Sequence, residues 1–143
     1  MTTFDFGSGP VPAHQHPNGG GWVADTATVS ETAYVGPNAR VFDNAKVFPL
    51  ARVSGNAHVS DNARVSGNAH VSGNAKVFGN AHLFENALVS GDARVYDNAW
   101  VFGKAKVSGN AKVFGNAEVE GNAVVEGNAV VSGDAVVSGD AYD

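Results

Sequence analysis

The sequence lacks cysteine entirely, so the chain forms no disulfide bond and offers no thiolate to a metal ion. It also lacks an apolar run of the roughly 20 residues that a membrane-spanning helix needs. The first six residues, MTTFDF, contain neither the basic stretch nor the apolar stretch of a secretory signal. From these absences we expect a reducing, cytoplasmic setting and no contact with a membrane.

Bulky apolar side chains are scarce, although the chain is long enough for one domain with a core. Hydrophobic residues make up 43% of the 143 residues, but nearly all of them are alanine and valine, and glycine occurs 18 times. Such a narrow composition is typical of a repeat protein rather than of an ordinary globular domain.

Basic residues are absent from both ends of the chain. All nine Lys and Arg lie between Arg40 and Lys112, and five acids accompany them, so this segment carries +4. Residues 1–39 add three acids and residues 113–143 add six, which accounts for the total charge of −5. The predicted molecule therefore has a basic middle between acidic ends.

An apolar residue returns every six positions from Val23 to Val137, in twenty units without an insertion, and Leu83 is its only substitution. Alanine stands two residues before it in nearly every unit, and a turn pair such as Gly-Asn follows it. The alternation predicts a short strand with one buried face, and the turn pair predicts a sharp corner. Three such six-residue sides close a triangular coil, and neighbouring coils pair in parallel about 4.8 Å apart.

The segment YVGPNARVFDNAKV (Tyr34–Val47) resembles the hexapeptide-repeat pattern of left-handed parallel β-helix proteins, and the resemblance covers about residues 21–142. This family includes acyltransferases and gamma-class carbonic anhydrases, and many members assemble as trimers. The resemblance implies a left-handed coil, whereas the usual crossover rule for parallel strands favours the right hand. We therefore predict an all-β protein, a single-stranded left-handed parallel β-helix whose triangular coils take three six-residue units, or 18 residues, each.

Two parts are expected, a non-repeat N-terminal cap over residues 1–20 and the β-helix over residues 21–143. The cap segment contains His14 and His16, which we also consider as contributors to a ligand site at that end. Within the repeats, Pro49-Leu50 replaces the usual turn pair, and Lys104 stands where asparagine usually bends the chain. We expect local distortion at both places.

Positions one coil apart lie above one another, so the outward residue before each inward valine can be sorted by face. Face A carries Trp22, Arg40, His58, Lys76, Arg94, Lys112 and Val130; face B carries Thr28, Lys46, Arg64, His82, Trp100, Glu118 and Val136; face C carries Tyr34, Arg52, His70, Leu88, Lys106 and Val124. From Arg40 to Lys112, eleven of these thirteen positions are Arg, Lys or His. The position after the valine carries aromatic residues in the units of faces A and B, namely Phe42, Phe78, Tyr96 and Phe114, and Phe48, Phe84 and Phe102.

Solubility explains a polar surface, but it does not explain one sign of charge stacked at about 4.8 Å or aromatic residues that point outward. Another subunit is the commonest cover for an apolar stripe. We therefore expect a homo-oligomer in which face A of one chain contacts face B of the next, and the family precedent favours a trimer. The basic column would then line clefts between the subunits.

Cations neutralise phosphate and aromatic faces stack bases, so the expected ligand is a small anionic, ring-containing molecule, with a nucleotide as the natural candidate. Long nucleic acid fits less well, because the total charge of −5 repels a polyanion. The predicted ligand-binding residues are Arg40, His58, Arg64, Lys76, Phe78, His82, Phe84, Arg94, Tyr96 and Trp100, with His14 and His16 as possible additions.

No loop interrupts the repeats to carry catalytic groups, and we predict no catalytic residue, cofactor or metal site. His58, His70 and His82 fall on three different faces, and a third zinc ligand is lacking even across a subunit contact. We predict a non-enzymatic protein that sequesters a nucleotide signal, and near-identical repeats of this kind are common in bacterial and phage-encoded solenoids. The alternatives are a hexapeptide-repeat acyltransferase-like enzyme and a structural fibre or spike segment.

Overall fold

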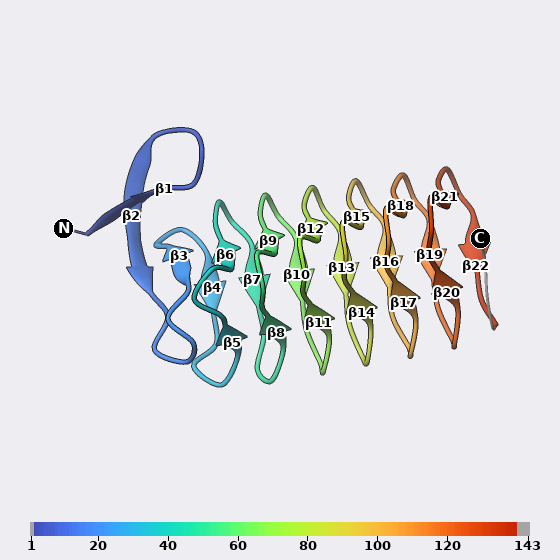
Figure 1. The fold of residues 1–143 in the computed structure, drawn as a ribbon, viewed down its shortest axis with the longest axis horizontal. Helices are drawn as coiled ribbons and strands as arrows, with labels where there is room; N and C mark the ends of the chain where they lie inside the picture. The colour runs from blue at the N-terminus through green and yellow to red at the C-terminus, as the bar shows by residue number, and fades with distance from the viewer. Residues whose placement is uncertain (1, 140–143) are drawn as a thin grey trace.

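Each six-residue unit contributes one short strand, and every third strand joins the same sheet (Figure 1). The structure is a computed structural model that describes residues 2–139. Residues 140–143, and with them Tyr142, to which we expected the coil to extend, lie outside the described part. The prediction of an all-β protein with coils of 18 residues is confirmed, because paired positions of neighbouring coils, such as Asn80 and Asn98, are separated by that interval.

Three sheets form the sides of the solenoid. The sheet of face A contains β1 (Thr3–Asp5), β2 (Pro10–Gln15), β3 (Trp22–Ala24), β6 (Arg40–Val41), β9 (His58–Val59), β12 (Lys76–Val77), β15 (Arg94–Val95), β18 (Lys112–Val113) and β21 (Val130–Val131). The sheet of face B contains β4 (Thr28–Val29), β7 (Lys46–Val47), β10 (Arg64–Val65), β13 (His82–Leu83), β16 (Trp100–Val101), β19 (Glu118–Val119) and β22 (Val136–Val137). The sheet of face C contains β5 (Tyr34–Val35), β8 (Arg52–Val53), β11 (His70–Val71), β14 (Leu88–Val89), β17 (Lys106–Val107) and β20 (Val124–Val125).

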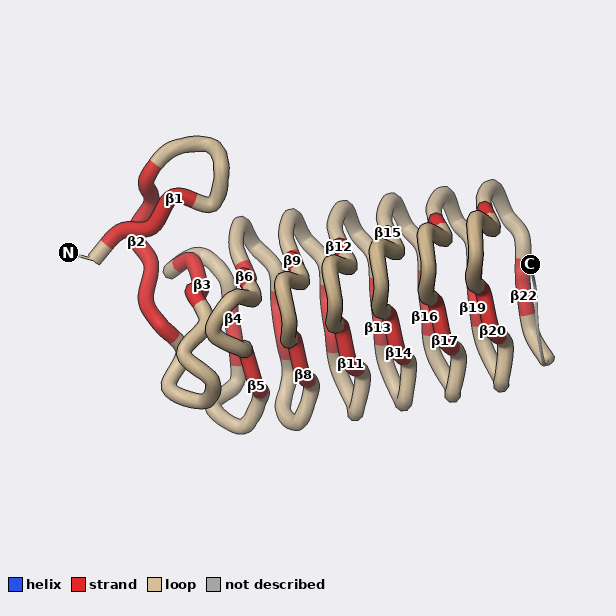
Figure 2. The backbone as a smooth tube through the Cα atoms, viewed as in Figure 1, coloured by secondary structure: helices blue, strands red, loops and turns tan. Residues whose placement is uncertain are grey.

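From β3 onward, every strand pairs in parallel with the strand at the same place in the neighbouring coil. Lys76 lies opposite Arg94, and Arg94 lies opposite Lys112. In Figure 2 the strands of face C pass in front of those of face B while the coils advance along the axis. This is the left-handed winding that the family resemblance implied.

The lumen holds the inward alanines and valines of every coil. From Ala33 to Val125 these side chains are at most 2% exposed, and Leu83 is the largest of them. Small residues are required because all three sides of a coil meet in the lumen, and each side chain packs against the same position of the coils on either side.

Backbone hydrogen bonds tie each unit to the next coil. In the unit of residues 75–80, three backbone N–H groups donate to carbonyl oxygens of the next coil at 2.7–3.0 Å. Lys76 donates to Ala93, Phe78 donates to Val95, and Asn80 donates to Asp97. Turn asparagines add a side-chain ladder along the corners. Asn80 donates to Asn98 at 3.3 Å and Asn98 donates to Asn116 at 3.3 Å. Asparagine at these turns therefore links coils as well as bending the chain.

From Asp43 onward, the first residue of every turn pair except Pro49-Leu50 adopts positive φ, which favours glycine but is also occupied by aspartate. Asp61 has φ of 57°, and its carboxylate accepts a hydrogen bond from the N–H of Gly79 at 3.0 Å. Asp97 accepts the N–H of Gly115 at 3.2 Å in the same way. The carboxylate satisfies a backbone donor of the next coil and so offsets the strain of the left-handed conformation.

The two irregular turns differ in outcome. At Pro49-Leu50 the ring of proline fixes a negative φ, so the positive φ moves to Leu50 at 71°, and the leucine side chain is exposed. At Lys104 the turn is regular, because Gly103 has φ of 68° and the N–H of Lys104 donates to Gly121 at 2.8 Å. The expectation of distortion at Lys104 is wrong, since the turn depends on the backbone of Gly103.

The N-terminal segment forms an antiparallel hairpin of β1 and β2 that adds to the edge of β3. The aromatic rings of this hairpin stack on rings of the first two coils. The ring centroids of Phe4 and Trp22 are 4.7 Å apart, and those of Phe6 and Phe42 are 4.9 Å apart. The division at residues 1–20 and 21–143 stays a prediction, but the hairpin was not anticipated.

We predict that Gly73→Ala lowers stability by about 1–2 kcal/mol, because Gly73 has φ of 62° and an added Cβ would lie 2.9 Å from the backbone of Gly91. Gly73→Asp is the matched variant. Its carboxylate can accept the N–H of Gly91, as Asp61 does for Gly79, so it should recover about 1 kcal/mol. Chemical denaturation measures both, and an equal loss in the two variants would contradict the role given to the carboxylate.

Candidate functional site

Three consecutive strands of face A present cations side by side. Lys76, Arg94 and Lys112 come from β12, β15 and β18, and all three side chains are exposed. Like charges directly opposite each other on neighbouring strands destabilise a sheet. Faces B and C carry no run of three Lys or Arg, so this cationic column is particular to face A.

A groove of about 430 Å³ follows the cationic column. Besides the three cations, its walls are Asn74, Asp92 and Asn110, which belong to the turns that lead into face A. Asn74 donates to the carboxylate of Asp92 at 3.2 Å. Among residues 2–139 the only close contact between a basic and an acidic side chain joins His14 to Asp25, so no cation of the groove pairs closely with an acid. The groove is therefore suited to an anion.

Toward the N-terminus, the same column continues through His58 and Arg40. Arg40 is half-buried, and its guanidinium lies over the ring of Phe4 at 4.9 Å. Burial, then the nearby charges of Arg40 and Lys76, lower the pKa of His58. Near neutral pH the charge of the column therefore comes from arginine and lysine.

The pKa values of the other two histidines of the repeats are also lowered, which favours their neutral form. Burial, then the charge of Arg52, lowers the pKa of His70, and burial, then the charge of Arg64, lowers the pKa of His82. His70 also lies 3.3 Å from the hydroxyl of Ser54.

The outward aromatic residues form stacks within one chain. Phe78 stacks on Tyr96 at 4.8 Å, and Tyr96 stacks on Phe114 at 4.9 Å, with ring planes within 5° of parallel. Phe84 stacks on Phe102 at 4.6 Å. These five rings are half-buried, because each covers the face of its neighbour. A second subunit is therefore not needed to shield the ring faces.

Two aromatic residues remain more exposed than the stacked rings. Trp100 is 42% exposed and Phe48 is 38% exposed, and both belong to the units of face B. Trp100 lies beside His82 at 5.8 Å and beside Phe84 at 5.8 Å. They form the part of the aromatic surface best suited to a partner.

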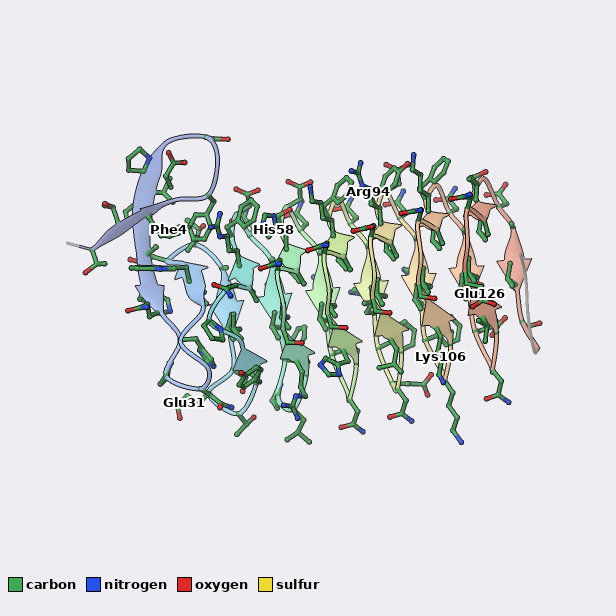
Figure 3. All side chains as sticks on the ribbon, in the orientation of Figure 1. Phe4, Glu31, His58, Arg94, Lys106 and Glu126 are labelled. Atoms are coloured by element: carbon green, nitrogen blue, oxygen red, sulfur yellow. The ribbon has the colours of Figure 1, made fainter. Side chains whose placement is uncertain are left out.

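The structure divides the predicted ligand-binding residues between two faces. Arg40, His58, Lys76 and Arg94 lie on face A, and Arg64, His82 and Trp100 lie on face B. One chain does not bring the two groups into a single site. Figure 3 shows His58 and Arg94 along the same edge of the solenoid, with Lys106 away from it.

The two histidines of the N-terminal segment differ in their exposure to solvent. His16 is 3% exposed, and its Nε2 donates to the carbonyl oxygen of Ala33 at 2.9 Å. His14 is exposed and lies 2.8 Å from the carboxylate of Asp25. His16 therefore packs across the first coil, and only His14 is open to solvent.

Sequence reasoning left Lys112, Asn74 and Asn110 out of the predicted site. The coil-to-coil spacing could have added them, because it places Lys112 directly after Arg94 and places the two asparagines beside the column. Phe4 and Phe6 had no such signal, since they lie outside the repeat.

In the described part of the chain, no three His, Asp or Glu side chains come close enough together to hold a metal ion. Residues 2–139 also contain no helix of the length and apolarity that a membrane crossing requires.

Comparison with known families gives a match in two segments of the chain. The family model described as the YdcK beta solenoid repeat matches residues 57–73 and 87–103, which together cover less than half of the chain. In these segments the chain is similar to that repeat. Each matched segment is just under one coil and contains three strands, so the match agrees with a solenoid of hexapeptide-like repeats. The comparison with curated proteins found no match.

Proposed function

We propose that this β-solenoid is a non-enzymatic binding protein for a small anionic, ring-containing ligand, with a nucleotide as the first candidate. The observation that supports it is the column of Lys76, Arg94 and Lys112 along the groove of face A. Stacking three cations costs stability unless an anion relieves the repulsion, and a phosphate chain has the charge and length to do so.

A small ligand suits the groove better than long nucleic acid does. The total charge is −5, and acidic segments lie on both sides of the basic middle, so a polyanion that extends along the solenoid meets repulsion at each end. A compact anion contacts the cations of three coils and no more.

A purely structural role is the second candidate, and the aromatic stacks favour it. The ring faces of Phe78, Tyr96 and Phe114 stack on each other, and this stacking stabilises the coils without any ligand. Stacking does not account for the cationic column, so we place ligand binding first.

We test ligand binding by isothermal titration of a panel of linear and cyclic nucleotides. Loss of one charge-assisted contact in Arg94→Gln should weaken binding by about 1.5–3 kcal/mol. Lys106→Gln is the matched control, because it removes the same charge from face C, where the next coils carry Leu88 and Val124. Binding should also weaken as salt is added.

No binding to the unaltered protein at high micromolar nucleotide would contradict the proposal and favour the structural role. Equal losses in Arg94→Gln and Lys106→Gln would show that general charge, rather than the column on face A, attracts the ligand.

We also propose that the protein assembles as a homotrimer, with the exposed rings of face B at the contact. Trp100→Ser combined with Phe48→Ser should lower the mass measured by light scattering, because both rings are exposed. Tyr96→Ser is the control, since it removes a ring stacked on both sides and should lower the melting temperature at unchanged mass. A monomeric mass for the unaltered protein would contradict the assembly.

A further inference from the structure

The aromatic column at the corner between faces A and B is interrupted at one coil. Its rings are Phe42, then Phe78, Tyr96 and Phe114, each located directly after the inward valine of its unit. Ser60 occupies the position between Phe42 and Phe78. The column therefore lacks one ring at the level of β9.

The gap has the height of one planar ring. Phe78 and Tyr96, one coil apart, stack at 4.8 Å, so Phe42 and Phe78, two coils apart, are separated by roughly 9.6 Å. A ring halfway between them would lie about 4.8 Å from each, which is within the range of stacked aromatic pairs.

Both flanking rings keep one face without a stacked partner in the described structure. Phe42 stacks on Phe6 at 4.9 Å, and Phe78 stacks on Tyr96 at 4.8 Å. Ser60 between them is half-buried and small, so its side chain does not fill the space. His58 turns its ring at 81° to that of Phe42, at 5.9 Å, and so borders the gap without completing the stack.

Charge is distributed unequally around the gap. On the side of face A, His58 lies at the same level, and Lys76 and Arg94 follow one and two coils further on. On the side of the turns, Asp61 and Gly79 line a cavity of about 760 Å³ beneath the hairpin loop, and Phe42 also contributes to it. An anionic group attached to a ring in the gap is therefore drawn toward the cationic column of face A.

We propose that the gap over Ser60 is the subsite for the planar ring of the ligand, which stacks between Phe42 and Phe78 while its anionic part lies along Lys76 and Arg94. This inference rests on the proposed function and specifies the ligand as one planar ring joined to a phosphate or similar anion. The ring restores the missing member of the column, and the anion relieves the repulsion of the groove.

The corner between faces B and C offers a matched comparison. Ser66 there lies between Phe48 and Phe84, so the same coil lacks a ring on both corners. Beyond that gap, the column of face B continues through His82, Trp100 and Glu118, which offer no run of lysine and arginine to an anion. Ser66→Phe therefore changes a similar gap outside the proposed site.

The test compares adenosine 5′-triphosphate with inorganic tripolyphosphate, which has the anion but no ring, by isothermal titration without divalent metal. The unaltered protein should bind the nucleotide at least about tenfold more tightly than tripolyphosphate, the gain typical of one stacked base. Ser60→Phe fills the gap and should abolish this preference while leaving tripolyphosphate binding unchanged. Ser66→Phe should retain the preference.

Equal affinities for the two compounds in the unaltered protein would overturn the ring subsite but leave anion binding intact. A nucleotide preference that persists in Ser60→Phe would also overturn it. If neither compound binds at millimolar concentration, the proposed function fails and the subsite fails with it.

A second pair of variants keeps the test independent of how Ser60→Phe folds. Phe78→Leu removes one stacking face of the gap and should reduce the nucleotide preference by about tenfold. Phe102→Leu removes a comparable stacked ring from face B and should leave the preference unchanged. Equal preferences in these two variants would contradict the subsite.

Discussion

The fixed register between neighbouring coils is the constraint on which the rest of this structure depends. In most units three backbone hydrogen bonds to the next coil hold this register. The lumen enforces it, because a slip would bring outward residues into a space that admits only alanine, valine and one leucine. The choice of residues at the turn pair is also constrained, by the positive φ of its first residue and by the side-chain hydrogen bonds that run from Asn80 to Asn116. These requirements leave the outward positions of each unit free to vary.

The free positions do two different things. The one after the valine builds stacks such as Phe78 on Tyr96, which stabilise the coils directly. The one before the valine places Lys76, Arg94 and Lys112 in a row that costs stability. A feature that opposes stability points to function more strongly than one that supports it. We therefore base the proposal on the cations and use the interruption of the stack at Ser60 to place the ring.

Most of the fold could be predicted from the sequence, because period, alternation and turn residues all act locally and repeat twenty times. The hairpin of β1 and β2 could not be predicted, because its pairing with β3 depends on contacts outside the repeat, such as the stacking of Phe4 on Trp22. Of the site, the face of each cation followed from the coil spacing. The stacking of the aromatic rings could not be predicted, because only the three-dimensional structure shows that they stack on each other rather than remain open to a partner.

The most direct measurement identifies small molecules that copurify with the protein. Unaltered protein, Arg94→Gln and Lys106→Gln are purified in parallel and denatured, and the released compounds are compared by mass spectrometry. We expect an anionic, ring-containing compound to be released from the unaltered protein and from Lys106→Gln, and to be depleted from Arg94→Gln. The absence of such a compound from all three, or its equal release from all three, would contradict the claim that the cationic column of face A binds the ligand.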